Sequence, residues 1–284
     1  MVTRDVRTIA AGLAFAEGPR WHDGRLWFSD MGAGVVLAVD PDGGTPEVVV
    51  EVPGRPSGLG WLPGGQLLVV SMAQRSVLRL EGGELVVHAD LSALVRHDCN
   101  DMVVAPGGDA YVGNPGFDLT ARPLEVVPAE VVLVRPDGRA SVVDDEVLFP
   151  NGSVVTGGGS TLVVAETFGN RLTAFDIAPD GTLSDRRTWA TLPGRSPDGI
   201  CLDAEGAIWV ADASSSACLR VREGGEVVDE VDVGPFGAYA CALGGASGTT
   251  LFVCRAESFS GAAMKRRSAA IVAFDVEVAG AGSP

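Results

Sequence analysis

Positive charge and histidine are scarce in this chain. Its 284 residues include 21 Lys and Arg against 37 Asp and Glu, for a formal net charge of −16, and three histidines. A protein that binds nucleic acid through the phosphate backbone needs a basic surface. The one basic cluster, residues 265–267, is typical of a solvated loop. We therefore expect no nucleic-acid partner.

Long apolar runs are also absent. No segment approaches the length that crosses a bilayer, and residues 1–5 carry charges of both signs with no apolar segment after them. We expect neither a membrane partner nor a secretory signal. No pattern in the sequence indicates an oligomeric state.

Cysteines are few and show no pairing pattern. The five form no CxxC pair and are odd in number, which favours free thiols in a reducing cytoplasm over a disulfide framework. Cys201 and Cys241 lie in apolar runs, where a buried and inert thiol is expected. Helix signals are nearly absent as well, and residues 92–97 offer one turn at most.

The chain is rich instead in a repeat of short apolar strands and tight turns. The second strands of the repeat units are spaced by 41, 43, 52, 46 and 43 residues, with markers at Trp27, Leu68, Tyr111, Val163, Trp209 and Phe252. Turns of the DG and GG type between such strands are a hairpin signal. Four strands per unit and six units predict an all-β fold, a six-bladed β-propeller that forms a single domain over residues 1–284. A large sandwich would not explain the six recurrences.

The last unit, which ends near Val278, is one strand short. Residues 6–12 have the composition of a strand and could complete it. We expect this N-terminal strand to close the ring and remove its exposed edges.

Four polar residues precede the innermost strands at nearly the same phase of the repeat: Glu17, Asn100, Asn151 and Asp198. Ser57 and Cys241 take the corresponding place in the other two units. Arranged around an axis, the four polar side chains would converge on one end of the channel. Their donors are all oxygens, which favours one hard divalent ion, Ca²⁺ first, with Zn²⁺, Mn²⁺ or Mg²⁺ as alternatives. The competing interpretation is that Asp and Asn beside glycine are ordinary turn residues.

Two extra-long loops, residues 114–129 and 255–268, would overhang the same end of the channel. Long loops on such a scaffold are usually functional. The loops at this end carry mostly apolar side chains, which favours a less polar substrate: Phe117, Leu119, Phe168, Phe236, Tyr239 and Phe259. Any of these aromatic rings could instead pack between blades.

Several sequence pieces carry a resemblance to a known family. They are AEGPRW with RLWFSD, CNDMVVAPGGDAYVGN, FPNGSVVT, VAETFGNRLTAFDIAPDGTLSDRR, SPDGICLDAEGAIWVAD and CALGG. In this order and spacing the chain resembles the SMP-30/gluconolactonase/LRE (regucalcin-like) family over nearly its full length. The resemblance implies a six-bladed propeller with one divalent metal ion and, as in many members, hydrolysis of lactones.

The resemblance also implies roles for single residues. Glu17, Asn151 and Asp198 correspond to metal ligands, Asn100 to a further residue at the metal or the substrate, and Asp101 to a substrate contact. Sugar-lactone members typically have an arginine where this chain has Asp98. A carboxylate cannot reproduce an arginine fork, so the departure puts an aldonolactone substrate in doubt, although Arg96 and His97 lie close enough in sequence to compensate.

The function that we expect is metal-assisted opening of a lactone or related ester. The ion would polarise the carbonyl group, and Asp198 would accept a proton from the attacking water. The alternative is a non-catalytic propeller that binds a ligand or partner while its ion is structural. A third option is a strictosidine-synthase-like enzyme that forms carbon–nitrogen bonds, which would need a glutamate acid/base such as Glu166 or Glu257.

Overall fold

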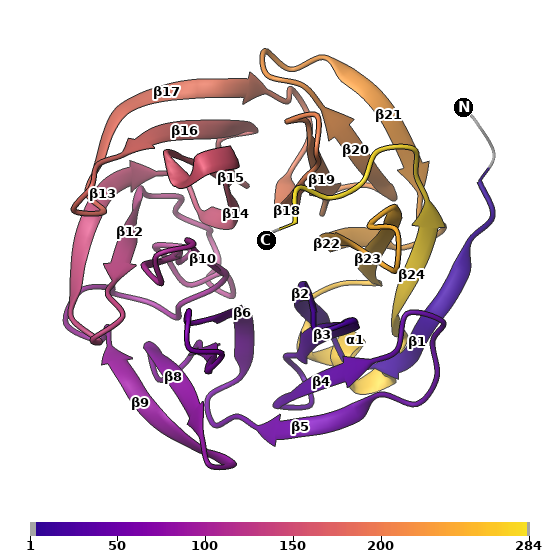
Figure 1. Ribbon diagram of the computed structural model, residues 1–284, viewed down its shortest axis with the longest axis horizontal. Coiled ribbons are helices and arrows are strands. Elements are labelled where there is room, and N and C mark those ends of the chain that lie inside the picture. The colour runs from indigo at the N-terminus through magenta and orange to yellow at the C-terminus, as the bar shows by residue number, and fades with distance from the viewer. Residues whose placement is uncertain (1–3, 283–284) are drawn as a thin grey trace.

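The computed structural model describes residues 4–282 and forms a ring of six four-stranded antiparallel sheets around a central channel (Figure 1). The predicted six-bladed β-propeller is therefore confirmed. In each sheet the strands follow one another in sequence from the channel outward, except that the last sheet gains a strand from the N-terminus.

The first three blades have these bounds. Blade one contains β2 (Ala16–His22), β3 (Arg25–Asp30), β4 (Val35–Val39) and β5 (Glu47–Glu51). Blade two contains β6 (Pro56–Trp61), β7 (Leu67–Ser71), β8 (Ser76–Glu81) and β9 (Glu84–Asp90). Blade three contains β10 (Met102–Val104), β11 (Ala110–Val112), β12 (Ala129–Val134) and β13 (Ala140–Val147).

The other three blades continue the pattern. Blade four contains β14 (Pro150–Val155), β15 (Thr161–Glu166), β16 (Arg171–Ile177) and β17 (Leu183–Thr191), with the 3₁₀ turn η1 (Gly157–Gly159) between its first two strands. Blade five contains β18 (Pro197–Leu202), β19 (Ile208–Asp212), β20 (Ala217–Val221) and β21 (Val227–Asp232). Blade six contains β22 (Gly237–Gly244), β23 (Thr250–Ala256) and β24 (Ala269–Asp275).

The N-terminal strand β1 (Arg7–Leu13) completes blade six. It pairs antiparallel with β24, with Arg7 opposite Ala273 and Leu13 opposite Ala269. The strand predicted at residues 6–12 is thus present, displaced by one residue. Because β1 and β24 come from opposite ends of the chain, this pairing closes the ring and covers an edge that would otherwise be open.

The blades differ in burial from the channel outward. Every residue of β14 and β18 is buried, whereas the outermost strand β5 has no buried residue. Inner strands are enclosed by neighbouring blades on both faces, so they consist of apolar and small residues rather than alternating polar and apolar ones.

Glycines let the inner strands approach one another. A Cβ atom on Gly58 would lie 2.3 Å from the Met102 nitrogen, and one on Gly152 would lie 2.6 Å from the Asp198 oxygen. Gly18 and Gly199 meet the next blade in the same way. The narrow channel therefore depends on the absence of a side chain at this repeated position.

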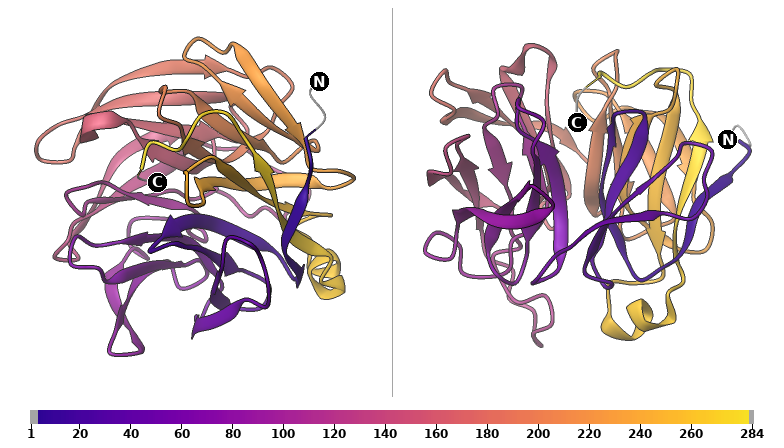
Figure 2. Two further views of the ribbon diagram at one scale, coloured as in Figure 1. Left: turned by 45° about the vertical axis from the view of Figure 1, so that its right-hand side comes forward. Right: turned by 60° about the horizontal axis from the view of Figure 1, so that its bottom comes forward.

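The ring has two distinct faces. The inner strands begin at the entry face and end at the tail face, where the C-terminal segment packs through hydrogen bonds from Ala204 N to Ala279 O and from Ala281 N to Leu202 O. The helix α1 (Gly261–Arg266) projects from the entry face, away from the C-terminal segment (Figure 2).

We did not predict α1 within the long loop at residues 255–268. Its N-cap is Ser260, whose side chain accepts a hydrogen bond from Ala263 N. Six residues are too few to show a helical period in the sequence. Among residues 4–282 no helix is long and apolar enough to span a bilayer.

Candidate functional site

A β-bulge recurs where the inner strands begin. One extra residue interrupts the pairing with the second strand in blades one, two, four, five and six. A bulge bends the strand and re-aims its side chains. The bulges contain Ser57, Asn151, Asp198 and Tyr239, and Glu17 immediately precedes the bulge of blade one. In blade three, Asn100 takes the corresponding place, with its N–H donating to the Gly113 carbonyl oxygen.

The residue at this position in blade six is Tyr239, so the expectation of Cys241 was wrong. We had located the position by counting back from the marker Phe252 with the spacing of the other blades, and that spacing does not hold in blade six. Phe252 pairs with Ala242, because the β22–β23 hairpin extends to the pair Gly244 and Thr250. That extra length moves the start of the inner strand two residues towards the N-terminus.

A chain of hydrogen bonds links the polar side chains of blades two to five. Ser57 Oγ donates to Asn100 Oδ1 at 3.2 Å, and Asn100 Nδ2 donates to Asn151 Oδ1 at 2.9 Å. Asn151 Nδ2 donates to Thr167 Oγ1 at 3.1 Å, and Thr167 Oγ1 donates to Pro197 O at 2.8 Å. The chain gives both amide groups a defined orientation. Ser57 lies at the repeat position that the sequence indicated for blade two, whereas Thr167 was not predicted, since no sequence signal distinguishes it from other buried hydroxyls.

Glu17 and Asp198 lie at the same end of the channel and are 8% and 7% exposed. Burial raises the pKa of Glu17 well above its ordinary value, and the charges of Asp198 and Asp101 raise it further. Burial also raises the pKa of Asp198, as does the charge of Asp101, whereas a hydrogen bond with Asn151 lowers it. Two carboxylates thus share a buried space, and no side chain of residues 4–282 forms an ion pair with either, although the Arg20 charge partly offsets the shift of Glu17.

The third carboxylate, Asp101, does have a cation. Its Oδ1 accepts hydrogen bonds from Arg20 Nη2 at 3.0 Å and from Met102 N at 2.8 Å. Arg20 also donates to the Pro19 and Met102 carbonyl oxygens. Of the three buried negative charges, one is therefore paired, and the remaining two match the charge of one divalent cation. We did not single out Arg20 from the sequence, although it follows Glu17 in the EGPRW piece.

The donor set at this site is limited to oxygens of carboxylates and amides. Among residues 4–282, no three His, Cys, Asp or Glu side chains gather in a way that could hold a metal ion. A site here would consist of Glu17 and Asp198 with the amide oxygen of Asn151, which fits a hard ion and not a thiolate or imidazole site.

Tyr239 adds a hydroxyl group to the ring. Burial raises its pKa to about 12, with further contributions from the charges of Asp198 and Glu17. Its ring packs edge-on against Phe15 at a centroid distance of 4.8 Å. The phenol therefore remains protonated at neutral pH and can act as a hydrogen-bond donor near both carboxylates.

Asp98 lies at the rim of the entry face, where its carboxylate pairs with Arg55. Both side chains are partly exposed, and Arg55 belongs to the loop that leads into β6. The guanidinium group beside Asp98 is thus supplied by Arg55, from blade two. We had considered only Arg96 and His97 because they are neighbours in sequence.

Phe117 belongs to an aromatic cluster with Phe149 and Phe168. Its ring centroid lies 6.4 Å from that of Phe149 and 5.5 Å from that of Phe168, and the latter two rings stack at 5.9 Å. Phe117 and Phe149 are buried, whereas Phe168 is 38% exposed. Phe168 follows Thr167, so the cluster forms an apolar wall beside the amide groups.

Neither glutamate considered for the third option is a free acid. Glu166 is fully buried and accepts hydrogen bonds from Leu148 N, Arg171 and Thr173. These bonds lower its pKa despite the opposing effect of burial. Glu257 is ion-paired with Arg266 of α1. The acid/base role needed for carbon–nitrogen-bond formation therefore has no candidate in these two residues.

The sequence matches a family model described as the SMP-30/gluconolactonase/LRE-like region over residues 15–257. The diisopropyl-fluorophosphatase of Loligo vulgaris is 25% identical over 205 residues, which is 65% of each chain and so slightly under two thirds of that protein. Pentonolactonase XacC of Haloferax volcanii is 24% identical over 257 residues, 88% of this chain and 84% of that one.

The fold is also similar to that of solved structures. Regucalcin from Agrobacterium tumefaciens, described as a calcium-binding protein, superposes with a TM-score of 0.80. The identity is 21%, and the alignment covers 97% of this chain and 96% of that one. At this identity the likeness supports the fold alone.

Proposed function

The chain belongs to the SMP-30/gluconolactonase/LRE-like family, and from this premise we propose that it is a divalent-metal-dependent hydrolase that opens a lactone. Two relatives are named for hydrolysis of small molecules, and one of these is a pentonolactonase. The five free cysteines support a cytoplasmic location.

The observation that carries the proposal is the pair of buried carboxylates at the entry end of the channel. Burial raises the pKa of both Glu17 and Asp198, the charge of Asp101 raises both further, and the charge of Asp198 adds to the shift of Glu17. Such a pair is unfavourable unless protonated or neutralised by a cation. Asn151 would complete the set with its amide oxygen, which the hydrogen bond from Asn100 orients.

A bound divalent ion would supply Lewis-acid polarisation of the ester carbonyl and a lower pKa for water. We infer that it is Ca²⁺, held by Glu17, Asn151 and Asp198, because the donors are oxygens and the similar regucalcin is described as calcium-binding. Zn²⁺, Mn²⁺ and Mg²⁺ remain to be compared.

The other steps use side chains of the chain itself. Asp198 accepts the proton of the water that attacks the lactone carbonyl. Asn100, which already contacts Asn151, orients that amide or the substrate. Tyr239 is a protonated donor for an oxygen of the substrate. Asp101 supports the site through its pairing with Arg20.

The rim of the site favours a lactone that is less polar than a sugar lactone. Phe168 offers an exposed aromatic face beside the amides, backed by Phe117. At the boundary of blades two and three, Arg55 is paired with Asp98 and can contact a polar group of the substrate. If Asp98 determines the substrate class, Asp98→Arg should shift the preference towards sugar lactones, and an unchanged ranking of kcat/KM values would show that this position is not a determinant.

The decisive experiment is turnover of a panel of lactones, simple esters and diisopropyl fluorophosphate with Ca²⁺, Zn²⁺, Mn²⁺ or Mg²⁺ and after chelation. We expect hydrolysis of at least one lactone that is lost with the chelator and restored by an ion. If the ion raises thermal stability but nothing is hydrolysed, the protein is a non-catalytic ligand-binding propeller with a structural ion.

A test independent of activity uses the pH dependence of stability. A carboxyl group whose pKa is higher in the folded than in the unfolded protein favours folding as the pH falls towards its ordinary value. The chelated protein should therefore gain stability from Glu17 and Asp198 when the pH is lowered from 8 towards 5. Excess Ca²⁺ should remove this dependence, and Asp198→Asn should reduce it. An identical pH dependence with and without the ion would contradict the assigned ligands.

A further inference from the structure

Two cysteine thiols from neighbouring blades lie in contact. Cys201 Sγ in β18 is 3.6 Å from Cys241 Sγ in β22. These strands belong to different sheets, so no backbone ladder joins blades five and six at this point. The distance is greater than the S–S bond length of about 2.05 Å, and both residues are free thiols.

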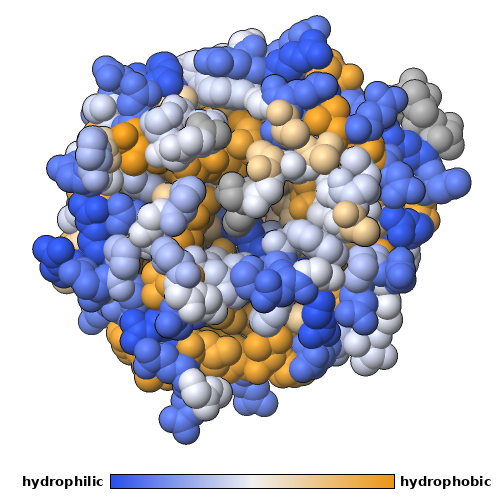
Figure 3. Space-filling model, viewed as in Figure 1, coloured by the Kyte–Doolittle hydropathy of each residue, from blue (hydrophilic) through white to orange (hydrophobic). Residues whose placement is uncertain are grey.

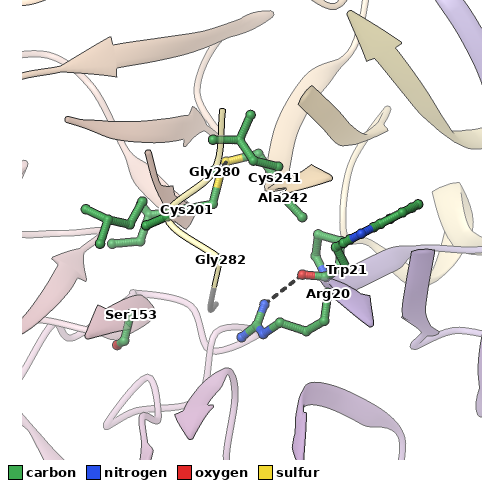
Figure 4. Close-up of a pocket in the computed structure, with 13 residues that line it drawn as sticks. Arg20, Trp21, Ser153, Cys201, Cys241, Ala242, Gly280 and Gly282 are labelled. Atoms are coloured by element: carbon green, nitrogen blue, oxygen red, sulfur yellow. Dashed lines mark hydrogen bonds between the residues drawn. The ribbon is translucent and has the colours of Figure 1, made fainter. Parts of the chain in front are cut away.

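The thiol pair lies on the tail side of the carboxylates, with Cys241 Sγ 3.6 Å from the carbonyl oxygen of Gly199, the residue that follows Asp198. The tail face is hollowed at the centre of the ring (Figure 3). A cavity of about 80 Å³ opens there, and its lining includes Cys201, Cys241 and the tail residues Gly280 to Gly282. Figure 4 shows both cysteine side chains beside the tail segment that contains Gly280. A molecule the size of a peroxide thus has space next to the thiols.

The two strands are already packed as closely as their backbones allow. A Cβ atom on Gly199 would lie 2.6 Å from the Ala240 Cα. Cys241 Sγ lies 3.4 Å from the Trp209 oxygen and 3.6 Å from the Gly199 oxygen, both in blade five. Since the side chain of Cys241 already points into blade five, side-chain rotation and a shift of about 1.5 Å between the sulphurs would bring them to bonding distance.

We propose that Cys201 and Cys241 form a reversible disulfide bond that links blades five and six when the protein meets a hydroperoxide. Both thiols are buried, as we expected from the sequence, and the proposal departs from the expectation that they are inert. The cavity gives a small oxidant access to the pair, in which Cys201 is 7% exposed and Cys241 1% exposed. Whichever thiol reacts first, its neighbour lies close enough to complete the bond.

The chemistry balances with hydrogen peroxide or an alkyl hydroperoxide as the oxidant. The sulphur of the first thiol attacks one peroxide oxygen and its proton passes to the leaving oxygen, so that an S–O bond forms, the O–O bond breaks, and water or an alcohol leaves. The sulphur of the second thiol then attacks the sulfenic sulphur and its proton passes to the leaving hydroxyl group, so that the S–S bond forms and the S–O bond breaks with release of water. The two thiols lose two electrons and two protons, and the peroxide is reduced.

The experiment counts thiols and maps the bond in the folded protein. After treatment with hydrogen peroxide and removal of the excess, denaturation with a thiol reagent should reveal three free thiols instead of five. Digestion without reduction should yield a peptide pair joined through Cys201 and Cys241. The thermal midpoint should rise by about 5 °C or more, because the bond closes a loop of some forty residues, and dithiothreitol should reverse all three changes.

Matched variants test which thiols react. Cys201→Ala and Cys241→Ala should each keep four free thiols without the joined peptide. Cys254→Ala, which changes an equally buried cysteine elsewhere in blade six, should still lose two. The proposal would be overturned if the treated wild type kept five unmodified thiols, or if the bond formed through Cys218 instead. Both outcomes are measured on the wild type, so they do not depend on any variant being folded.

Discussion

The two ends of the channel are formed by the same inner strands but differ in chemistry. At the entry end the strands begin with bulges that contain Asn151 and Asp198 or directly follow Glu17. At the tail end the pairing is regular, and the cavity is lined largely by small and apolar residues, with two thiols among them. A bulge gives a side chain a direction that the regular alternation of a strand does not allow. The buried carboxyl and amide groups of Glu17, Asn151 and Asp198 therefore converge at the entry end.

Arg20 is shared by both ends. Its side chain lines the cavity on the tail side (Figure 4), and its guanidinium group binds Asp101 on the entry side. The ion pair is almost completely buried. It lies between Glu17 and Asp198 on one side and the cavity on the other.

The largest effect is expected at the entry end. Asp198→Ala removes both a proposed ligand and the proposed proton acceptor, so activity with the best lactone should fall by at least about 10²-fold. Calorimetry should show no binding of the ion, while circular dichroism remains that of the folded protein. Asp176→Asn, at a partly exposed position of β16 in blade four, is the control. Full activity of Asp198→Ala would remove this residue from the mechanism.

Removing the buried ion pair between Arg20 and Asp101 should lower the stability of the folded protein. Arg20→Met leaves Asp101 buried without its partner and should lower the free energy of unfolding by about 3–5 kcal/mol, measured by urea denaturation. Adding Asp101→Asn to the same chain should restore part of the loss. If the double variant is no more stable than the single one, the buried charge is not the cause.

A substitution that pushes two inner strands apart should have an intermediate effect on stability. Gly199→Ala places a methyl group against the Ala240 backbone and should destabilise the protein by about 1–3 kcal/mol. Gly107→Ala meets no atom within 4 Å and is the matched control. Equal thermal midpoints for the two variants would show that the strands can move apart without penalty.

The smallest effect should come from the hydrogen-bond chain. Thr167→Val removes the hydroxyl group that orients Asn151 and should weaken ion binding about 10-fold, as measured by calorimetry. Thr167→Ser keeps the hydroxyl group and should bind the ion as the wild type does. Equal loss in both variants would point to packing of the threonine methyl group instead.

Much of this site could be predicted because its residues recur with the repeat. Glu17, Asn100, Asn151 and Asp198 were identified by phase alone, and the structure brings them to one end of the channel. Their roles remain proposals. Tyr239 was assigned to the rim and not to this ring, because the longer β22–β23 hairpin changes the spacing in blade six.

Partners from other blades could not be predicted. Arg20 with Asp101, Arg55 with Asp98, and Cys201 with Cys241 are each separated by about 40 to 80 residues. Local patterns contain no information on which side chains face each other across a blade boundary, since that depends on the angle and distance between sheets.

The sequence by itself determined the six-bladed ring, its closure by the N-terminal strand and the four polar residues at its centre. These follow from the period of apolar strands and from a backbone that must pair its edges. Only the tertiary structure decided which charges are paired and which are left unbalanced, and which thiols touch. Those outcomes depend on close packing between blades, where a missing Cβ atom or one extra bulged residue changes what each side chain meets.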